Sequence, residues 1–382
     1  MEILYKRHAE YLRKVKITFS RNFVNEIDWT DRLIGIKGSR GVGKTTFILH
    51  YIKENFANNK KYLYVSLDDL AFTEKTIVGL VEDFVKLGGK VLFLDEIHKY
   101  TNWSQELKNC YDRFQELKIV FTGSSILHIL KGNADLSRRA VVYEMEGLSF
   151  REFINIVTKQ KYDFKSYSLD EIIKDHYEIA LEITEKIKPF EFFADYLRYG
   201  FYPFFLESKT SYFKKLLSTI YLVLESDIAY LNNVELRHVQ KLKRLLYVLS
   251  TMVPLQPNVN KLSRDLETSR LTIMNYMNYL EDGRLIKLLH ADRYRTMKRP
   301  DKIFLDNTNL MYAIAPENVN KGNLRETFFY NQLNSRHFVN SSKSGDFLID
   351  EKYTFEVGGK NKSREQIKNV KNAFIAADPV IK

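Results

Sequence analysis

A short stretch near the amino terminus carries residue types that are suited to holding nucleotide phosphates. It reads Gly-Ser-Arg-Gly-Val-Gly-Lys-Thr-Thr and fits the pattern G-x-x-x-x-G-K-[ST]. Its glycines lack a Cβ, so the backbone can close around phosphate oxygens, to which N–H groups at the start of the next helix can donate. The lysine supplies charge to the β- and γ-phosphates, and the hydroxyl of Thr45 is a ligand for Mg²⁺. We predict a nucleotide-binding loop that consists of Gly38, Ser39, Arg40, Gly41, Val42, Gly43, Lys44, Thr45 and Thr46.

A pair of acids, Asp95 and Glu96, follows the apolar residues 91–94. Such a run indicates a parallel strand that is buried on both faces, with the acids at its carboxyl end, where open α/β sheets bind nucleotides. We expect Asp95 to hold Mg²⁺ and Glu96 to orient or deprotonate an attacking water. An acidic strand end that only caps the next helix is the alternative. No Asn-Lys-x-Asp motif for reading guanine occurs, so we predict ATP as the nucleotide.

Other polar side chains fall where they could reach the same phosphates. Thr122, Ser124 and Ser125 follow the next apolar run, and we assign Ser124 to the nucleotide site, although an ordinary turn would use the same residues. Arg138 and Arg139 precede a further strand. A guanidinium there could stabilise transition-state charge, either in the same chain or from a neighbouring subunit. The predicted catalytic residues are therefore Lys44, Glu96, Arg138 and Arg139.

Strands and helices must alternate to bring these residues together. Apolar strand patterns occur at 33–36, 61–67, 91–96, 118–122 and 141–145, and the segments between them have helical patterns. This alternation implies right-handed crossovers and a parallel sheet. A short amphipathic helix over residues 2–15 precedes the first strand. We predict an α/β core with a phosphate loop.

Composition limits what surrounds this core. The 382 residues exceed one ordinary domain, and a content of 45% hydrophobic and 28% charged residues is typical of a globular protein. A single cysteine, Cys110, excludes a disulfide framework, which together with the lack of a signal-peptide or membrane-spanning pattern predicts a cytoplasmic location without a membrane partner. The net charge of +11 permits contact with nucleic acid, but dispersed lysines also simply solubilise a surface.

The motifs as a set resemble one large prokaryotic family, the predicted AAA+-superfamily ATPases with a carboxyl-terminal domain of uncharacterised function. The resemblance covers nearly the whole chain. It rests on the phosphate loop, on Phe-Leu-Asp-Glu-Ile-His-Lys at 93–99, Trp103, Phe-Thr-Gly-Ser-Ser at 121–125 and Leu-Ser-Phe-Arg-Glu-Phe at 148–153. It implies an AAA+-type P-loop ATPase domain over 1–155, a helical lid or linker over 156–255, a winged helix-turn-helix over 256–310, and a restriction-endonuclease-like α/β domain over 311–382.

The pattern over residues 260–289 supports the winged helix independently. A helix over 261–266 and a second over 271–280, which Thr268 and Ser269 could cap, precede the apolar run 285–289. Ser269, Arg270, Thr272 and Asn275 would then face outward and suit contacts with double-stranded DNA. Winged helices also serve as protein-docking modules and as lids, so a protein partner is the alternative.

The last segment has the acids of a nuclease-like site. The resemblance implies that Glu326, Asp346, Glu356 and Lys360 would form it, with the carboxylates on Mg²⁺. Restriction-type nucleases place the lysine two residues after the acid, but position 358 is Gly and Lys360 lies one pleat, roughly 7 Å, farther along. A bulge at the two glycines could shorten this gap. We expect no convergence on a metal and no nuclease activity.

Taken together, these patterns predict a Mg²⁺-dependent ATPase with ATP and Mg²⁺ as cofactors. ATP hydrolysis would be coupled to a conformational change in the carboxyl-terminal half. The protein could work as a homo-oligomer with a DNA or protein partner. Two alternatives remain. One is an ATP-gated DNA nuclease in defence or mobile-element biology, and the other is a DNA-binding regulator that senses ATP without hydrolysing it.

Overall fold

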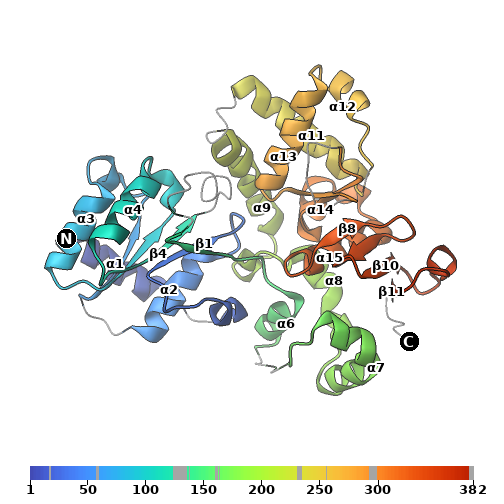
Figure 1. The fold of residues 1–382 in the computed structure, drawn as a ribbon, viewed down its shortest axis with the longest axis horizontal. Helices are drawn as coiled ribbons and strands as arrows, with labels where there is room; N and C mark the ends of the chain where they lie inside the picture. The colour runs from blue at the N-terminus through green and yellow to red at the C-terminus, as the bar shows by residue number, and fades with distance from the viewer. Residues whose placement is uncertain are drawn as a thin grey trace. The chain divides into compact units, whose positions relative to one another are not determined.

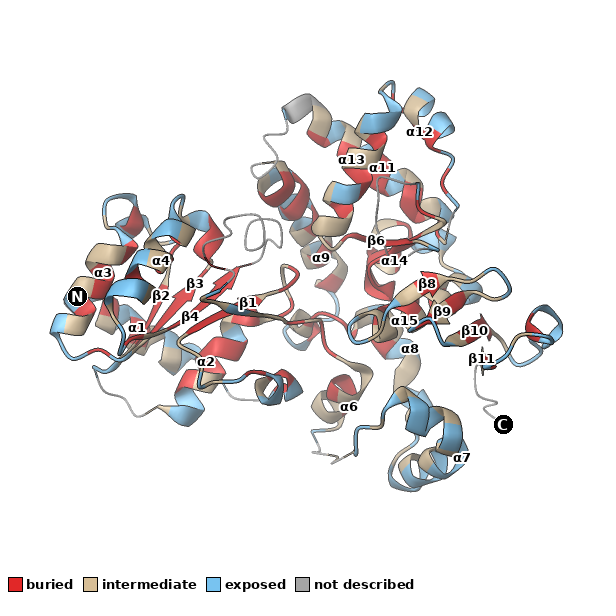
Figure 2. Ribbon diagram, viewed as in Figure 1, coloured by how far each residue is buried: buried red, intermediate tan, exposed pale blue. Residues whose placement is uncertain are grey.

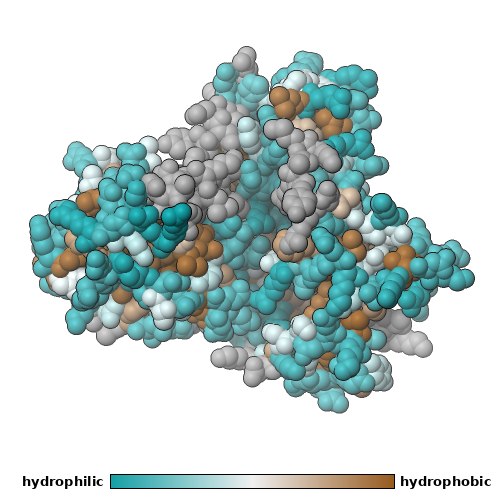
Figure 3. All heavy atoms as spheres, viewed as in Figure 1, coloured by the Kyte–Doolittle hydropathy of each residue, from teal (hydrophilic) through white to brown (hydrophobic). Residues whose placement is uncertain are grey.

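The computed structural model describes residues 1–16, 19–56, 60–123, 136, 138–159, 162, 164–229, 235–254, 256–291 and 299–377. The chain divides into two compact units, Met1–Gly147 and Leu148–Lys382, whose elements are labelled in Figure 1. None of the helices in the described segments is long and apolar enough to cross a bilayer. On the face drawn in Figure 3, apolar side chains form small groups among hydrophilic ones.

The first unit is built on a five-stranded sheet with the order β2-β3-β4-β1-β5. All neighbouring strands are parallel, which confirms the predicted α/β core. The order places β4 between the strand that leads into the phosphate loop and the strand that ends in Asp95. The strands are β1 (Leu33–Lys37), β2 (Tyr62–Ser66), β3 (Val91–Asp95), β4 (Lys118–Gly123) and β5 (Val141–Glu144).

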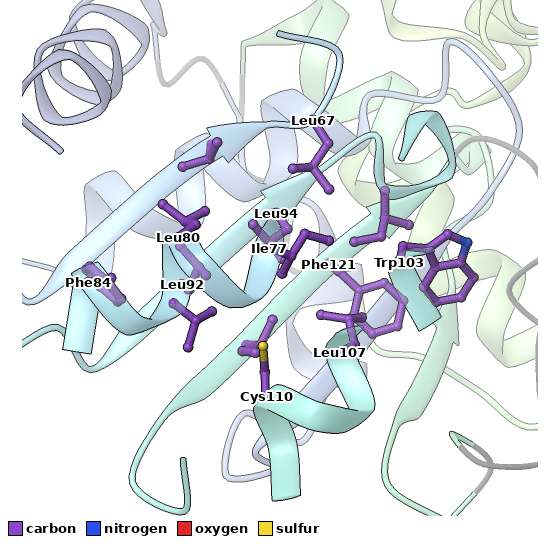
Figure 4. Packing of buried hydrophobic residues seen from close by; sticks show 14 of the residues in the cluster. Leu67, Ile77, Leu80, Phe84, Leu92, Leu94, Trp103, Leu107, Cys110 and Phe121 are labelled. Atoms are coloured by element: carbon purple, nitrogen blue, oxygen red, sulfur yellow. The ribbon is translucent and has the colours of Figure 1, made fainter. Parts of the chain in front are cut away.

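Helices cover both faces of this sheet because its strands alternate their side chains between two apolar layers. The helices are α1 (Glu2–Lys14), α2 (Lys44–Asn55), α3 (Ile77–Lys86) and α4 (Trp103–Arg113), with 3₁₀ turns at η1 (Asn22–Glu26), η2 (Leu70–Thr73) and η3 (Ile97–Lys99). Leu92 and Leu94 pack with α3 and α4 (Figure 4). Phe93, which lies between them in β3, contacts Tyr51 of α2 instead.

Cys110 lies within the layer formed by α3 and α4 (Figure 4). Its side chain is fully buried, and burial raises the pKa of the thiol to about 12. The thiol is therefore a packing group and not a nucleophile.

Helix α1 supports the edge of the sheet at β2. Nδ1 of His8 accepts a hydrogen bond of 3.0 Å from the backbone N–H of Tyr64, a donor that an edge strand would otherwise expose. His8 is buried, and burial lowers its pKa. The imidazole is therefore a neutral acceptor in the folded protein.

Helices make up most of the second unit. Aromatic residues join several of them, since Tyr196 contacts Phe150, Phe153 and Phe328; the aromatic-rich middle of the chain thus forms a core. The helices are α6 (Phe150–Thr158), α7 (Leu169–Lys186), α8 (Phe190–Tyr199), α9 (Tyr212–Leu222), α11 (Leu236–Met252), α12 (Val259–Asp265), α13 (Arg270–Asp282), α14 (Thr308–Ile314) and α15 (Lys321–Asn334), with shorter turns at η4 (Pro203–Leu206), η5 (Val223–Ile228), η6 (Pro316–Asn318) and η7 (Glu365–Ile367).

The second unit also contains two sheets. Strands β6 (Ile286–Leu289) and β7 (Lys302–Leu305) form an antiparallel pair after α12 and α13, which is the succession of elements that a winged helix requires. A four-stranded sheet has the order β11-β10-β9-β8. Its strands are β8 (Val339–Ser341), β9 (Phe347–Ile349), β10 (Tyr353–Gly358) and β11 (Ala373–Ala377).

The β6–β7 pair does not stand free as an isolated wing would. All of β6 is buried (Figure 2), and Leu289 and Phe304 share a core cluster with Phe347 of β9. In addition, the carbonyl of His290 accepts a hydrogen bond of 2.9 Å from the N–H of Ser341. The two strands are therefore part of the carboxyl-terminal core.

The buried His8 makes stability depend on pH in a defined direction. The histidine of the unfolded chain titrates near pH 6.5, whereas the folded pKa is lower. Below about pH 6.5 the unfolded chain takes up a proton that the folded protein resists, so the free energy of unfolding falls until the folded pKa is passed. In His8→Asn, the amide oxygen should accept the same hydrogen bond without titrating. Urea unfolding at pH 7.5 and 5.5 should show that the free energy of unfolding falls less in this variant than in the wild type. Equal falls in both proteins would contradict the assignment of the pH dependence to His8.

Candidate functional site

The predicted phosphate loop connects β1 to α2, and its glycines are required by the geometry. Gly43 has a φ of 97° at the first residue before α2, a conformation that L side chains rarely adopt. A Cβ at Gly38 would lie 2.2 Å from the carbonyl oxygen of Met145. The buried Lys44 donates from Nζ to the carbonyls of Gly38 at 2.8 Å and Ser39 at 2.9 Å. The ammonium is thus held at the loop.

A buried arginine that precedes β1 forms a hydrogen bond with the same loop. Arg21 donates from Nη1 to the carbonyl of Val42 at 3.1 Å. Its Nη2 donates to the carbonyls of Glu146 at 2.9 Å and Gly147 at 3.0 Å. One guanidinium therefore joins the phosphate loop to the last residues of the first unit. Three carbonyls in fixed positions suit its planar set of donors.

Asp95 is the centre of the site. Its side chain is almost fully buried, with 2% exposed. Oδ2 accepts hydrogen bonds from the Thr45 hydroxyl at 2.7 Å and from the Tyr64 phenol at 2.8 Å, and Oδ1 accepts one from the hydroxyl of Thr122. Burial and the adjacent Asp95 carboxylate raise the pKa of Tyr64 far above its ordinary value, so the phenol remains a proton donor.

Glu96 leaves the strand in a different direction from Asp95. Its backbone has a φ of 56°, and its N–H donates to the Thr122 hydroxyl at 3.2 Å. Oε2 of Glu96 lies 3.3 Å from Nε2 of His98, whose side chain is buried. The Glu96 carboxylate is therefore paired with the His98 imidazole, next in sequence to the candidate metal ligand Asp95.

These side chains fit a nucleotide with Mg²⁺. The Thr45 hydroxyl and the Asp95 carboxylate are hard oxygen donors of the kind that Mg²⁺ prefers, and they lie within hydrogen-bond distance of each other. Lys44 would supply the positive charge for the phosphates.

The two predicted arginines lie at the amino ends of the strands, whereas the phosphate loop follows a carboxyl end. β1 and β5 are parallel, with Ile34 opposite Val141; the phosphate loop follows the carboxyl end of β1, whereas Arg138 and Arg139 precede the amino end of β5. Arg139 forms two hydrogen bonds with Asp112 of α4, at 2.8 and 3.0 Å, and these hold the pKa of Asp112 below its usual range. An in-chain role at the phosphates does not fit this placement, and a role across a subunit boundary stays a prediction. Ser124 lies outside the described residues.

The carboxyl-terminal acids meet lysines. Nζ of Lys302 lies 3.3 Å from Glu326 and 3.2 Å from Asp346, while the buried Glu356 pairs with Lys362. Burial opposes the charge of Lys302, yet the two carboxylates raise its pKa, and burial also raises the pKa of Glu326. Across the described ranges, no three His, Cys, Asp or Glu side chains are grouped to hold a metal ion.

The lysine beside Glu356 is not the one expected. β10 pairs regularly with β11 up to Gly358, so no bulge shortens the distance to the exposed Lys360. The chain instead turns after the strand, with the N–H of Lys362 donating to the carbonyl of Gly359 at 2.9 Å. This turn brings Lys362 back to the acid.

Sequence reasoning missed four residues of these two sites, namely Arg21, Tyr64, His98 and Lys302. His98 lies in the quoted motif at 93–99 and could have been noticed as a neighbour of Glu96. The other three act through contacts with residues far away in the chain, for which a single sequence gives no signal.

The fold and the loop define a P-loop nucleotide-binding protein. Residues 30–154 match a family described as an AAA domain, which confirms the resemblance drawn from the motifs. The first unit therefore contains most of a P-loop AAA domain. Residues 190–318 match a domain of unknown function, DUF8612.

Two relatives are uncharacterized proteins of Methanocaldococcus jannaschii. MJ1637 is 27% identical over 66% of this chain and 56% of its own length, so the match spans only about half of that relative. MJ1544 is 25% identical over 87% of this chain and 73% of its own length. Neither name states an activity.

Two solved structures show partial similarity. One is Caenorhabditis elegans PCH-2, at 15% identity over 41% of this chain and 44% of that one, with a TM-score of 0.25. The other, from a study of katanin self-assembly, has 19% identity over 36% of this chain and 50% of that one, also with a TM-score of 0.25. These scores are too low to inform the site.

Removing the ammonium at Lys302 should destabilise the second unit. Lys302→Met leaves Glu326 and Asp346 without the ammonium that contacts both of them, which we expect to cost about 1–2 kcal/mol of unfolding free energy at pH 7.5, discounted because the lysine is partly exposed. Acidification toward pH 5 should reduce this cost, since Glu326 already has a raised pKa. The control is Lys352→Met, which removes an exposed pair with Asp170 and should change little. Equal urea-unfolding curves for both variants would contradict the prediction.

Proposed function

We propose that this protein hydrolyses ATP in a Mg²⁺-dependent reaction at the phosphate loop. The observation that carries the proposal is the 2.7 Å hydrogen bond between Thr45 and Asp95. It brings together the two oxygen ligands that Mg²⁺ would need, next to the loop that contains Lys44. The match to an AAA domain over residues 30–154 supports the same reaction.

Each side chain has a distinct role in this proposal. The N–H groups at the start of α2 and Lys44 bind the phosphates. Thr45 and Asp95 would hold Mg²⁺, which when bound would supply positive charge to the phosphates. Glu96 accepts a proton from the attacking water. The water oxygen bonds to the γ-phosphorus, and the bond between this phosphorus and the bridging oxygen breaks, so that ADP leaves. His98 orients the Glu96 carboxylate.

We further propose that the loop is mechanically linked to the chain that leaves the first unit. Arg21 binds both the loop carbonyl of Val42 and the carbonyls of Glu146 and Gly147. A movement of the loop on hydrolysis would therefore pull on the segment that leads into Leu148. This supports coupling of hydrolysis to a conformational change in the carboxyl-terminal half.

Double-stranded DNA is the partner that we propose for α13. Arg270 and Leu271 are exposed at its start. Of the other residues expected to face a partner, Ser269 caps the helix by accepting from the Thr272 N–H at 3.0 Å, and the hydroxyls of these two bond each other at 2.8 Å. Arg270 is therefore the best candidate for a phosphate contact. A nuclease has less support, because the ammonium of Lys302 contacts both Glu326 and Asp346, in the place that a shared metal ion would take.

Two substitutions test the hydrolysis directly. Lys44→Ala should abolish ATP binding, because the phosphates lose their positive partner. Glu96→Gln should retain binding and reduce turnover by a factor on the order of 10²–10⁴. Turnover should be measured by phosphate release, with and without duplex DNA, and binding by calorimetry.

The matched control is Glu116→Gln, a change of an exposed acid in the same unit. It should leave both binding and turnover unchanged. Wild-type turnover in Glu96→Gln would assign the base elsewhere, and wild-type ATP affinity in Lys44→Ala would refute the nucleotide site.

A role for Arg139 across a subunit boundary requires an assembly. ATPase activity per chain should then rise with protein concentration, and a mixture of Arg139→Ala with Lys44→Ala should regain part of the activity. Asp112→Asn is the control, because it removes the ion pair and keeps the guanidinium. Constant specific activity on dilution to a proven monomer would exclude this role.

A further inference from the structure

A tyrosine outside the recognised motifs contacts the centre of the proposed site. Tyr64 lies in the middle of β2, and its side chain is buried, with 2% exposed. Its phenol donates to Oδ2 of Asp95 at 2.8 Å. The same oxygen accepts from Thr45 at 2.7 Å, so Tyr64 and the proposed Mg²⁺ ligand Thr45 bind one carboxylate atom.

Strand register explains how Tyr64 reaches this atom. Ser66 of β2 lies opposite Asp95 of β3. Leu63 and Val65 belong to the core on the α3 and α4 side of the sheet, so Tyr64 points to the other face. Asp95 faces this side as well, since it follows Leu94 by one residue. The Tyr64 side chain therefore extends from β2 to Asp95 on the face of the sheet opposite α3 and α4.

Helix α1 fixes Tyr64 in this position. His8 accepts the backbone N–H of Tyr64 at 3.0 Å. The ring of Tyr11 packs edge-on against the ring of Tyr64, with centroids 5.2 Å apart. α1 lies outside residues 30–154, the part that matches the AAA domain. Helix α1, which lies outside the matched residues, thus holds Tyr64, a residue within them.

We propose that Tyr64 is a positioning residue for Mg²⁺, and that α1 is part of the nucleotide site through it. This inference rests on the proposed function. The phenol holds the Asp95 carboxylate in the orientation that presents an oxygen beside Thr45. Partners of this kind, which bind a metal ligand rather than the metal, typically change metal affinity by about 10–100-fold when they are removed.

The test is Tyr64→Phe in the full chain, which removes one hydroxyl and keeps the ring. Binding of a fluorescent ATP analogue should be measured without Mg²⁺ and across a Mg²⁺ titration. The variant should bind the analogue normally without Mg²⁺, because Lys44 and the loop are unchanged. The Mg²⁺ concentration at half effect should rise about tenfold or more.

Tyr62→Phe is the matched control. It removes a phenol hydroxyl from the same strand, and this hydroxyl makes no hydrogen bond with any described residue. It should titrate like the wild type. A second variant, Tyr11→Leu, keeps the phenol of Tyr64 and removes its ring neighbour, and it should weaken the Mg²⁺ response by a smaller factor. This variant provides the test if Tyr64→Phe does not fold.

Three outcomes would overturn the proposal. An unchanged Mg²⁺ titration in Tyr64→Phe would show that the phenol does not position Asp95. An equal loss of binding with and without Mg²⁺ would show that Tyr64 acts only on the fold. A wild-type protein that binds no nucleotide would refute the proposed function itself, and the Lys44→Ala variant would then behave like the wild type.

Discussion

The first unit depends on the burial of one carboxylate. Asp95 is 2% exposed, and a buried charge is costly unless it accepts enough hydrogen bonds. Its donors come from three elements: Thr45 from α2, Tyr64 from β2 and Thr122 from β4. The strand order β2-β3-β4-β1 places β2 and β4 on either side of β3, so Tyr64 and Thr122 reach Asp95 from both neighbouring strands. The sheet topology therefore supplies two of the three donors.

Local patterns predicted the parts of this arrangement that are contiguous in sequence. The phosphate loop, the strand that ends in Asp95 and Glu96, and the parallel sheet all have short-range signals in spacing and hydrophobicity. The contacts of Arg21 with Glu146 and of Tyr64 with Asp95 join distant segments, and one sequence contains no record of such pairs. The in-chain role considered for Arg138 and Arg139 stays without support, because the parallel pairing of β5 with β1 places both arginines before the amino end of β5.

The second unit shows how a recognisable pattern can be built into a larger core. The helices α12 and α13 were predictable from caps and periodicity, but the burial of the following strand pair was not. Leu289 and Phe304 pack with Phe347, and Lys302 of β7 binds Glu326 and Asp346. These contacts come from α15, from β9 and from the residue that precedes β9. The strand pair that follows α13 is therefore packed into the carboxyl-terminal core.

The burial of Cys110 has a practical consequence for spectroscopy. Maleimides and similar reagents attack the thiolate, and a thiol with no exposure and a pKa of about 12 offers them almost none. A cysteine introduced on the surface of either unit would then be the one reactive thiol of the folded chain. Fluorophores could be attached to chosen positions in both units without first replacing the native residue, and any slow labelling of Cys110 would report how often the α3 and α4 layer opens.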